Sequence, residues 1–207
     1  MKNFNYSNLI NQFYDKLKTE KFDEVLDAAL QLNREIYLGG IDSTVADNVE
    51  AIIRFWNFVD ESAGTPAAER RPIKMYINSP GGELQATFSI IDAMAMSETP
   101  IYTINIGEAC SGGFFIAIAG HARFAYPHSH FMYHEGSVGM GGDAHKFRNA
   151  ADFYKKQLNQ LKEHTLKFTN LTEEDYERII KDDYWLTADD ALAIGVCDQI
   201  ITDFCYE

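Results

Sequence analysis

Short apolar runs typical of strands alternate along the chain with segments that have a helical period. The β-prone runs lie at 36–40, 73–79 and 101–107, and the segments 45–59 and 84–94 repeat apolar residues every three or four positions. Strands that alternate with helices in this way are typical of a largely parallel sheet with right-handed crossovers. The pattern therefore predicts one α/β domain.

The second half of the chain adds further elements to this scheme. The segment 114–120 is apolar on every side, which predicts a buried helix, and two short strands are expected around 123–127 and 130–134. The longest helical pattern, 144–168, has a near-heptad apolar seam, which indicates a helix that packs on the sheet or meets another subunit. The seam consists of Phe147, Ala151, Tyr154, Leu158, Leu161 and Phe168.

The ends of several helices can also be predicted from single residues. Thr172 and Thr187 each precede an acidic residue by three positions, as N-caps do, and Gly195 is a suitable C-cap for the last helix. The segment 196–202 is then expected to be a final strand. At the other end of the chain, apolar spacing over 6–30 predicts one or two amphipathic helices.

Charge and composition exclude several kinds of partner. Lys and Arg number 18 against 31 Asp and Glu, for a formal net charge of −13, so neither nucleic acid nor anionic lipid is expected to bind. We find no apolar run near the roughly 18 residues of a membrane span, and the N-terminal residues do not look like a secretory signal. Three cysteines without a CxxC spacing fit a reducing compartment, and a cytoplasmic location is expected.

The first candidate for chemistry is Ser111, which stands between a predicted strand and the buried helix. The first turn of a helix offers unpaired N–H groups that favour a developing oxyanion, and Gly112 and Gly113 let a substrate backbone approach closely. The alternative is that Ser111 only caps its helix. The neighbouring Cys110 raises the question of a reactive thiol, but a small buried side chain is the favoured interpretation.

A serine nucleophile needs a base and an acid to orient that base. His134 follows a predicted strand and can project into a cleft, and Asp183 precedes the aromatic pair Tyr184 and Trp185, although either Asp182 or Asp183 can equally be a loop residue. The histidines His121, His128, His130 and His134 fit none of the usual metal-ligand spacings, and no cysteine or carboxylate is suitably interleaved with them, so no metal site is expected.

Taken together, these segments resemble the proteolytic subunit of the Clp protease (ClpP) family, peptidase family S14. The matching blocks are REIYLGGID near 34, MYINSPGGELQATFSIIDAM at 75–94, INIGEACSGGFFIAIAG at 104–120, HFMYHEG at 130–136 and DYWLTADDALAIGVCDQI at 183–200. The resemblance implies a ClpP/crotonase-like spiral of β-β-α units with a protruding long helix. It also divides the chain into an N-terminal helical or axial segment, 1–33, and a peptidase domain, 34–207.

The resemblance further implies a serine endopeptidase with Ser111 as nucleophile, His134 as general base and Asp183 as the orienting carboxylate. The backbone N–H groups of Gly82 and Gly112 would form the oxyanion hole. Family members stack two heptameric rings into a tetradecamer around a sealed chamber. AAA+ Clp ATPases use ATP to feed unfolded polypeptides into it, and the subunit itself needs no cofactor. The helix 144–168 matches the region that meshes the two rings.

The chain departs from the family pattern at a few positions. Glu135 and Gly136 replace the usual Gln-Pro after the histidine, and Asp182 stands where an arginine usually contacts the opposite ring. The segment before Asp183 is also shorter than is usual in the family, so Asp182 is a second candidate for the third catalytic position. These departures put the stacking of the rings in question. Two alternatives keep the fold: a crotonase-type enzyme acting on coenzyme A thioesters, and a catalytically silent ring subunit. A relative with a lysine base is disfavoured because no lysine lies in the motifs.

Overall fold

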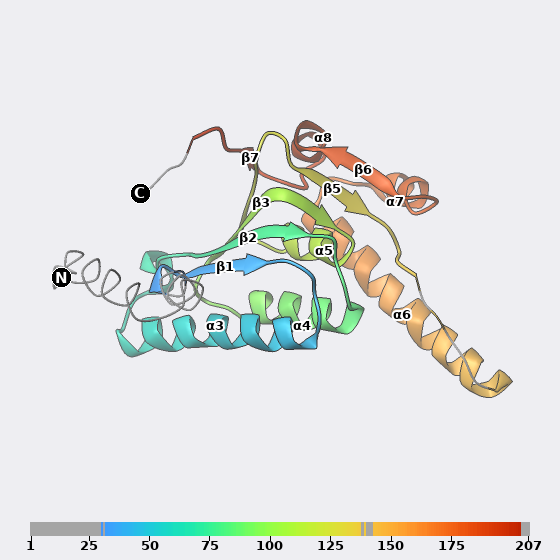
Figure 1. Ribbon diagram of the computed structural model, residues 1–207, viewed down its shortest axis with the longest axis horizontal. Helices are drawn as coiled ribbons and strands as arrows, with labels where there is room; N and C mark the ends of the chain where they lie inside the picture. The colour runs from blue at the N-terminus through green and yellow to red at the C-terminus, as the bar shows by residue number, and fades with distance from the viewer. Residues whose placement is uncertain (1–29, 31, 138, 140–142, 204–207) are drawn as a thin grey trace, which may run out of the picture.

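Seven strands form one sheet in the computed structural model, which describes residues 30, 32–137, 139 and 143–203 (Figure 1). The strand order is β1-β2-β3-β4-β7, and β5 pairs with both β3 and β6. All pairs are parallel except β5 with β6. The strands are β1 (Glu35–Leu38), β2 (Ile73–Ser79), β3 (Ile101–Cys110), β4 (Ala122–Ala125), β5 (His130–Tyr133), β6 (Tyr184–Thr187) and β7 (Gln199–Ile200).

Helices connect the parallel strands and cover the sheet. Helices α3 and α4 pack against each other below β1 and β2, and α5 packs against β3 and the start of α4 (Figure 1). The C-terminal half of α6 packs against the body, while its N-terminal half extends away from it. The helices are α3 (Ser43–Ser62), α4 (Leu84–Ala95), α5 (Gly112–Ile118), α6 (Ala144–Phe168), α7 (Glu173–Ile179) and α8 (Ala188–Ala193), with a 3-10 turn η1 (Ala67–Glu69).

The structure confirms the predicted single α/β domain, its parallel sheet and its protruding long helix. Every residue of α5 is buried, as its apolar sequence predicts, and both Thr172 and Thr187 form capping boxes. The expected strand at 196–202 is only two residues long, and strand β6 was not expected. The helices predicted within 6–30 lie outside the described residues. Within the described residues, no helix is both long and apolar enough to cross a bilayer.

A buried ion pair between Arg34 and Asp60 joins the start of β1 to the end of α3. The Arg34 Nη1 and Nη2 atoms donate to the two carboxylate oxygens of Asp60 at 2.7 and 2.6 Å, and Thr99 Oγ1 donates to the same carboxylate at 2.8 Å. The Arg34 guanidinium also lies 4.3 Å from the ring centroid of Trp56. Burial opposes ionisation of Asp60, but the hydrogen bonds from Arg34 and Thr99 outweigh it and lower the pKa of the carboxyl group.

Replacing Asp60 with alanine is expected to lower the free energy of unfolding by about 3–5 kcal/mol, because it leaves the Arg34 guanidinium buried without its partner. Urea unfolding at pH 7 measures the loss. The exposed neighbour Glu61→Gln is the control and should change stability by less than about 0.5 kcal/mol. Because the folded-state pKa of Asp60 is lowered, its contribution is present above the unfolded pKa of about 3.9 and disappears as the pH falls through the folded value. An unchanged urea midpoint for Asp60→Ala would contradict this role.

Candidate active site

Ser111 occupies a sharp turn between β3 and α5. Its φ of 54° and ψ of −120° are unusual for a residue with a side chain, and this kind of backbone strain costs roughly 1–3 kcal/mol. The Ser111 amide donates to the Met132 carbonyl of β5 at 2.9 Å, which fixes the turn beside that strand. The Ser111 hydroxyl forms no capping hydrogen bond with α5, so the interpretation of Ser111 as a simple helix cap is wrong.

Glycines surround Ser111 because the backbone segments approach one another too closely for side chains. A Cβ on Gly81, whose φ is 97°, would lie 2.7 Å from the Ser111 Cβ, and one on Gly82 would lie 1.9 Å from the Ile41 carbonyl oxygen. A Cβ on Gly112 would lie 3.5 Å from the Gly82 nitrogen, so the amides of Gly82 and Gly112 are near neighbours. Gly112 opens α5, where an N–H group has no acceptor within the helix.

His134 and Asp183 lie opposite each other because β5 and β6 pair in antiparallel fashion. Tyr133 is the register partner of Tyr184, so the next residue on one strand faces the preceding residue on the other. The His134 Nδ1 atom lies 3.6 Å from the Asp183 Oδ1 atom. The Asp182 carboxylate instead accepts a hydrogen bond from the Asp183 amide at 2.9 Å. Of the two aspartates considered from the sequence, Asp183 is the one against the imidazole.

Residues from several separate segments line one cavity of about 510 Å³. Ser111 and His134 both line it, as do Gly82 and Gly112. The remaining lining includes α4 and α6 residues but no lysine, so a lysine base is not offered here. The lining residues are Gly82, Glu83, Leu84, Gln85, Thr87, Ser111, Gly112, Phe115, His134, Glu135, Gly136, Ser137, Tyr154, Gln157 and Leu161.

The other histidines, all of which the structure describes, have places elsewhere. His121 Nδ1 accepts from the Ile101 amide at 3.1 Å, and His164 Nε2 lies 2.9 Å from the Phe115 carbonyl oxygen. Neither side chain lines the cavity around Ser111, and nor do His128, His130 and His145. His134 is thus the histidine whose position fits a base for Ser111.

Cys110 does not compete with Ser111 as a nucleophile. Its side chain is buried, as the sequence predicts. Burial and then the nearby Glu108 carboxylate raise the pKa of Cys110 to about 11, so the thiol is protonated at neutral pH. The hydroxyl of Ser111 remains the candidate nucleophile.

The Glu135-Gly136 segment has a structural explanation that the sequence did not give. Gly136 has a φ of 80°, a conformation that proline cannot adopt, so the usual Gln-Pro would not fit this backbone. The Tyr154 hydroxyl on α6 donates to the Glu135 carbonyl at 2.8 Å. Tyr154 therefore anchors the segment that follows His134 to the long helix.

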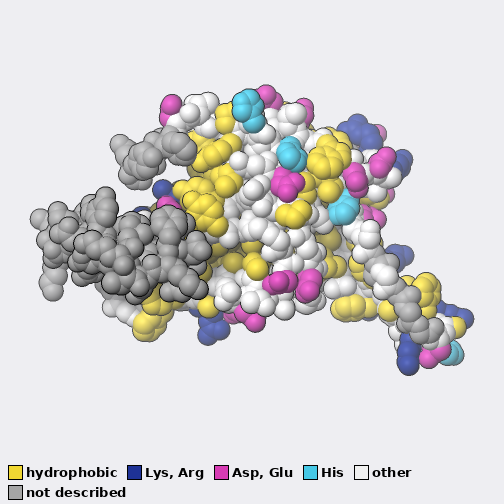
Figure 2. Space-filling view, in the orientation of Figure 1, with side chains coloured by type: hydrophobic (Ala, Val, Ile, Leu, Met, Phe, Trp, Pro, Cys, Tyr) yellow, Lys and Arg dark blue, Asp and Glu magenta, His cyan; other side chains and the backbone are white. Residues whose placement is uncertain are grey.

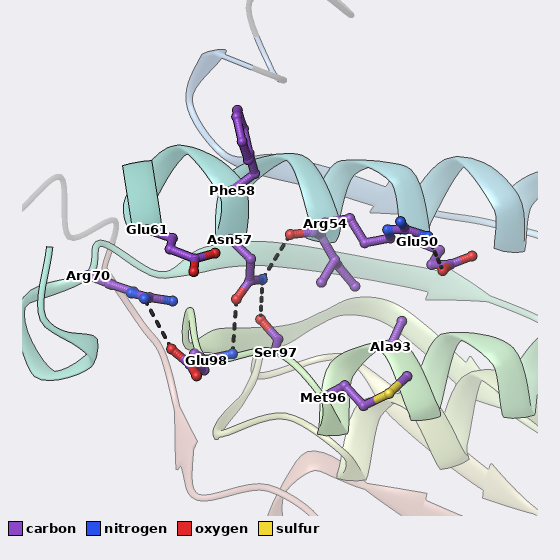
Figure 3. A pocket seen from close by; sticks show the side chains of 11 residues that line it. Glu50, Arg54, Asn57, Phe58, Glu61, Arg70, Ala93, Met96, Ser97 and Glu98 are labelled. Carbon is purple, nitrogen blue, oxygen red and sulfur yellow. Dashed lines mark hydrogen bonds and ion pairs between the residues drawn. The ribbon is translucent and has the colours of Figure 1, made fainter. Parts of the chain in front are cut away.

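A second hollow, of about 490 Å³, lies between α3 and α4 and lacks these groups (Figure 3). Four of its charged side chains form two ion pairs: Arg70 contacts Glu98 at 3.1 Å, and Arg54 contacts Glu50 at 3.4 Å. Asn57 donates to the Ser97 hydroxyl at 2.7 Å and accepts from the Glu98 amide at 3.0 Å. The Asn57 contacts link α3 to the residues that follow α4, and the lining offers no histidine base for a serine.

Comparisons with known proteins show which family the chain belongs to. A family model described as Clp protease matches residues 18–204. The chain is 35% identical over 187 residues to an ATP-dependent Clp protease proteolytic subunit 2 of Nocardia farcinica, covering 87% of this chain and 86% of the relative. It is 31% identical over 196 residues to the subunit 2 of Prochlorococcus marinus, covering 90% and 92%. It is 32% identical to the subunit 2 of Rhodococcus jostii over 87% of this chain and 89% of the relative.

Proposed function

This chain belongs to the Clp protease family of serine peptidases, and from that premise we propose that it is an endopeptidase in which Ser111, His134 and Asp183 form the catalytic triad. One observation carries the proposal. Ser111 and His134 line one cavity, and the Asp183 carboxylate lies 3.6 Å from the imidazole nitrogen of His134.

The reaction is acyl transfer. Ser111 Oγ attacks the peptide carbonyl while His134 takes its proton, and the same imidazolium then returns the proton to the leaving amine. Water, deprotonated by His134, next hydrolyses the acyl-enzyme. Asp183 orients the imidazole and stabilises its charged form. The 3.6 Å separation is longer than a direct hydrogen bond, and catalytic contacts often tighten only when substrate binds.

The amides of Gly82 and Gly112 stabilise the oxyanion of the tetrahedral intermediate. Two supports come from the geometry: the two glycines line the same cavity as Ser111, and their close approach excludes side chains there. A single donor of this kind is worth about 10²–10³-fold in kcat. The bend at Ser111 fixes the hydroxyl relative to these amides without an opposing capping bond.

The substrate in this proposal is an unfolded polypeptide bound by strand addition, which uses main-chain hydrogen bonds and tolerates many sequences. An AAA+ Clp ATPase supplies that polypeptide and uses ATP, as the names of the relatives, "ATP-dependent Clp protease proteolytic subunit", suggest. No cofactor is needed in this subunit, and its cytoplasmic location stays a prediction.

Hydrolysis of a short fluorogenic peptide tests the proposed activity. The purified chain is expected to release the fluorophore without ATP, because a short peptide needs no unfolding before it enters the site. A coenzyme A thioester of an acyl group serves as the comparison substrate for the crotonase alternative and should remain intact. Turnover of the thioester without peptide cleavage would overturn the peptidase proposal, and turnover of neither would favour a silent subunit.

The subunit assembles, in this proposal, into two stacked heptameric rings. The N-terminal half of α6 supports this because it projects from the body with large apolar side chains exposed: Phe147 is 52% and Phe153 60% exposed (Figure 1). Burial of such aromatic side chains is typical of a subunit interface.

Light scattering after size exclusion measures the assembly. A particle of fourteen subunits is expected for the full chain. The double variant Phe147→Asp, Phe153→Asp should form single rings or smaller species instead, because burial of an unpaired carboxylate in the contact between rings is costly. The matched control places Asp at the exposed Phe58, which lies on α3 rather than α6. A monomer at all concentrations would contradict the assembly but leave the chemistry standing.

A further inference from the structure

Three side chains of the kind that bind metal ions lie close together on the neighbouring strands β3 and β5, near the turn at Ser111. Glu108 and Cys110 are two residues apart on β3 and therefore lie on one face of the sheet. His130 on β5 is the parallel register partner of Glu108. Histidine and acidic side chains adjoin on the face of the molecule that Figure 2 draws.

The three donor atoms are close to one another. The Cys110 Sγ atom lies 3.8 Å from Glu108 Oε2, and His130 Nε2 lies 3.7 Å from the same oxygen. All the donor atoms fall within 4.8 Å of one another. The Trp185 ring, whose centroid lies 5.6 Å from that of His130, supports the imidazole from β6.

These separations are close to what a tetrahedral zinc ion requires. Zinc bonds of about 2.3 Å to sulfur and about 2.0–2.2 Å to nitrogen and oxygen give ligand-to-ligand separations of roughly 3.3–3.7 Å. Two of the three separations here already lie near that range. Rotation of the Glu108 and His130 side chains, which are 37% and 44% exposed, can close the third without moving the backbone.

We propose that Glu108, Cys110 and His130 bind one divalent transition-metal ion, with Zn²⁺ preferred and water completing the coordination. A thiolate, an imidazole and a carboxylate form a donor set that suits Zn²⁺ and its substitute Co²⁺, whereas Mg²⁺ and Ca²⁺ prefer oxygen ligands alone. The Cys110 thiol loses its proton to solvent as the Zn–S bond forms. This proposal replaces the expectation of no metal site, which rested on the spacing of the histidines and on the absence of a suitably interleaved cysteine or carboxylate in the sequence.

The position of the site suggests what the ion does. Strand β3 leads directly into Ser111, and β5 leads directly into His134. An ion held by ligands from both strands clips them together immediately before the two residues. Its binding is expected to raise the thermal unfolding temperature of the chain. The site does not depend on peptidase activity, so its test and that of the proposed function can fail separately.

Cobalt absorption tests the site. We would titrate Co²⁺ into the chain carrying Cys205→Ser, which removes a cysteine outside the described residues, under anaerobic conditions. The expected result is a thiolate-to-cobalt charge-transfer band that saturates at one Co²⁺ per chain, together with tetrahedral visible bands, and is abolished by added Zn²⁺. Absence of a saturable band at millimolar Co²⁺ would overturn the proposal.

Matched variants assign the ligands. Cys110→Ser and His130→Gln are each expected to abolish the charge-transfer band, and Glu108→Gln to weaken Co²⁺ binding at least tenfold. Cys197→Ser and His128→Gln, which change a buried cysteine and a histidine elsewhere, should leave the band unchanged. The His130 side chain is partly exposed, so we expect the His130→Gln variant to fold. Its circular dichroism spectrum, compared with that of the unchanged chain, checks this. A band that survives in folded His130→Gln, or that disappears in Cys197→Ser, would refute the site.

Discussion

The Ser111→Ala variant is expected to hydrolyse a fluorogenic peptide with a kcat about 10⁶-fold lower than that of the unchanged chain. The loss is large because no acyl-enzyme can form without the hydroxyl, while the His134 and Asp183 pair has nothing to activate. The structure offers no substitute nucleophile next to Ser111, since the Cys110 thiol is buried and its pKa is raised to about 11. Initial rates at saturating peptide measure kcat directly.

A second serine in the same cavity provides the matched control. Ser137 lines the cavity with Ser111 but lies beyond His134, on the segment that follows β5. The Ser137→Ala variant should change kcat by less than about tenfold, because it removes no group from the acyl-transfer steps. A Ser111→Ala enzyme that retains its rate, or a Ser137→Ala enzyme that loses it, would contradict the assignment of the nucleophile.

The Asp183→Asn variant is expected to lower kcat by about 10⁴-fold while the fold is unchanged. An amide in place of the carboxylate neither stabilises the imidazolium nor holds the ring in the tautomer that accepts the Ser111 proton. The prediction rests on the His134 Nδ1 atom, which faces Asp183 Oδ1 at 3.6 Å. Measuring kcat and KM separately shows whether the loss falls on the chemical step.

The neighbouring Asp182→Asn variant distinguishes the two candidate carboxylates. The Asp182 side chain accepts from the Asp183 amide, a local contact that an asparagine oxygen can also make. Its replacement is therefore expected to change kcat by less than about tenfold. The opposite pattern, with Asp182→Asn inactive and Asp183→Asn active, would place the orienting role on Asp182.

Most of the sheet could be predicted because its strands are short apolar runs bounded by clear turns. The predicted strand at 73–79 has the observed bounds of β2, and the predicted helix at 144–168 has those of α6. Strand β6 was missed because Tyr184–Thr187 runs without an intervening turn into α8, of which Thr187 is the N-cap, so the sequence indicated only the start of that helix there. That strand matters for the site, since its antiparallel pairing with β5 is what sets Asp183 beside His134.

The backbone conformation of Ser111 and the proposed metal ligands also could not be predicted from the sequence. The positive φ of Ser111 is imposed by the junction of β3 and α5, and no residue pattern signals it in a serine. Glu108 and Cys110 are separated from His130 by about twenty positions and meet only through the register of two parallel strands. Spacing along the chain finds ligands on one helix or hairpin, but it does not find ligands on paired strands joined by a long crossover.

The central claim is that the Ser111 hydroxyl is activated by its neighbours, and a fluorophosphonate probe tests it most directly. The probe forms a covalent bond only with an activated serine, and peptide mapping by mass spectrometry identifies the modified residue. We predict one modified residue per chain, Ser111, with labelling greatly slowed in Asp183→Asn and unaffected in Asp182→Asn. A folded chain that stays unlabelled, or that carries the probe on Ser137 or another residue, would contradict the account.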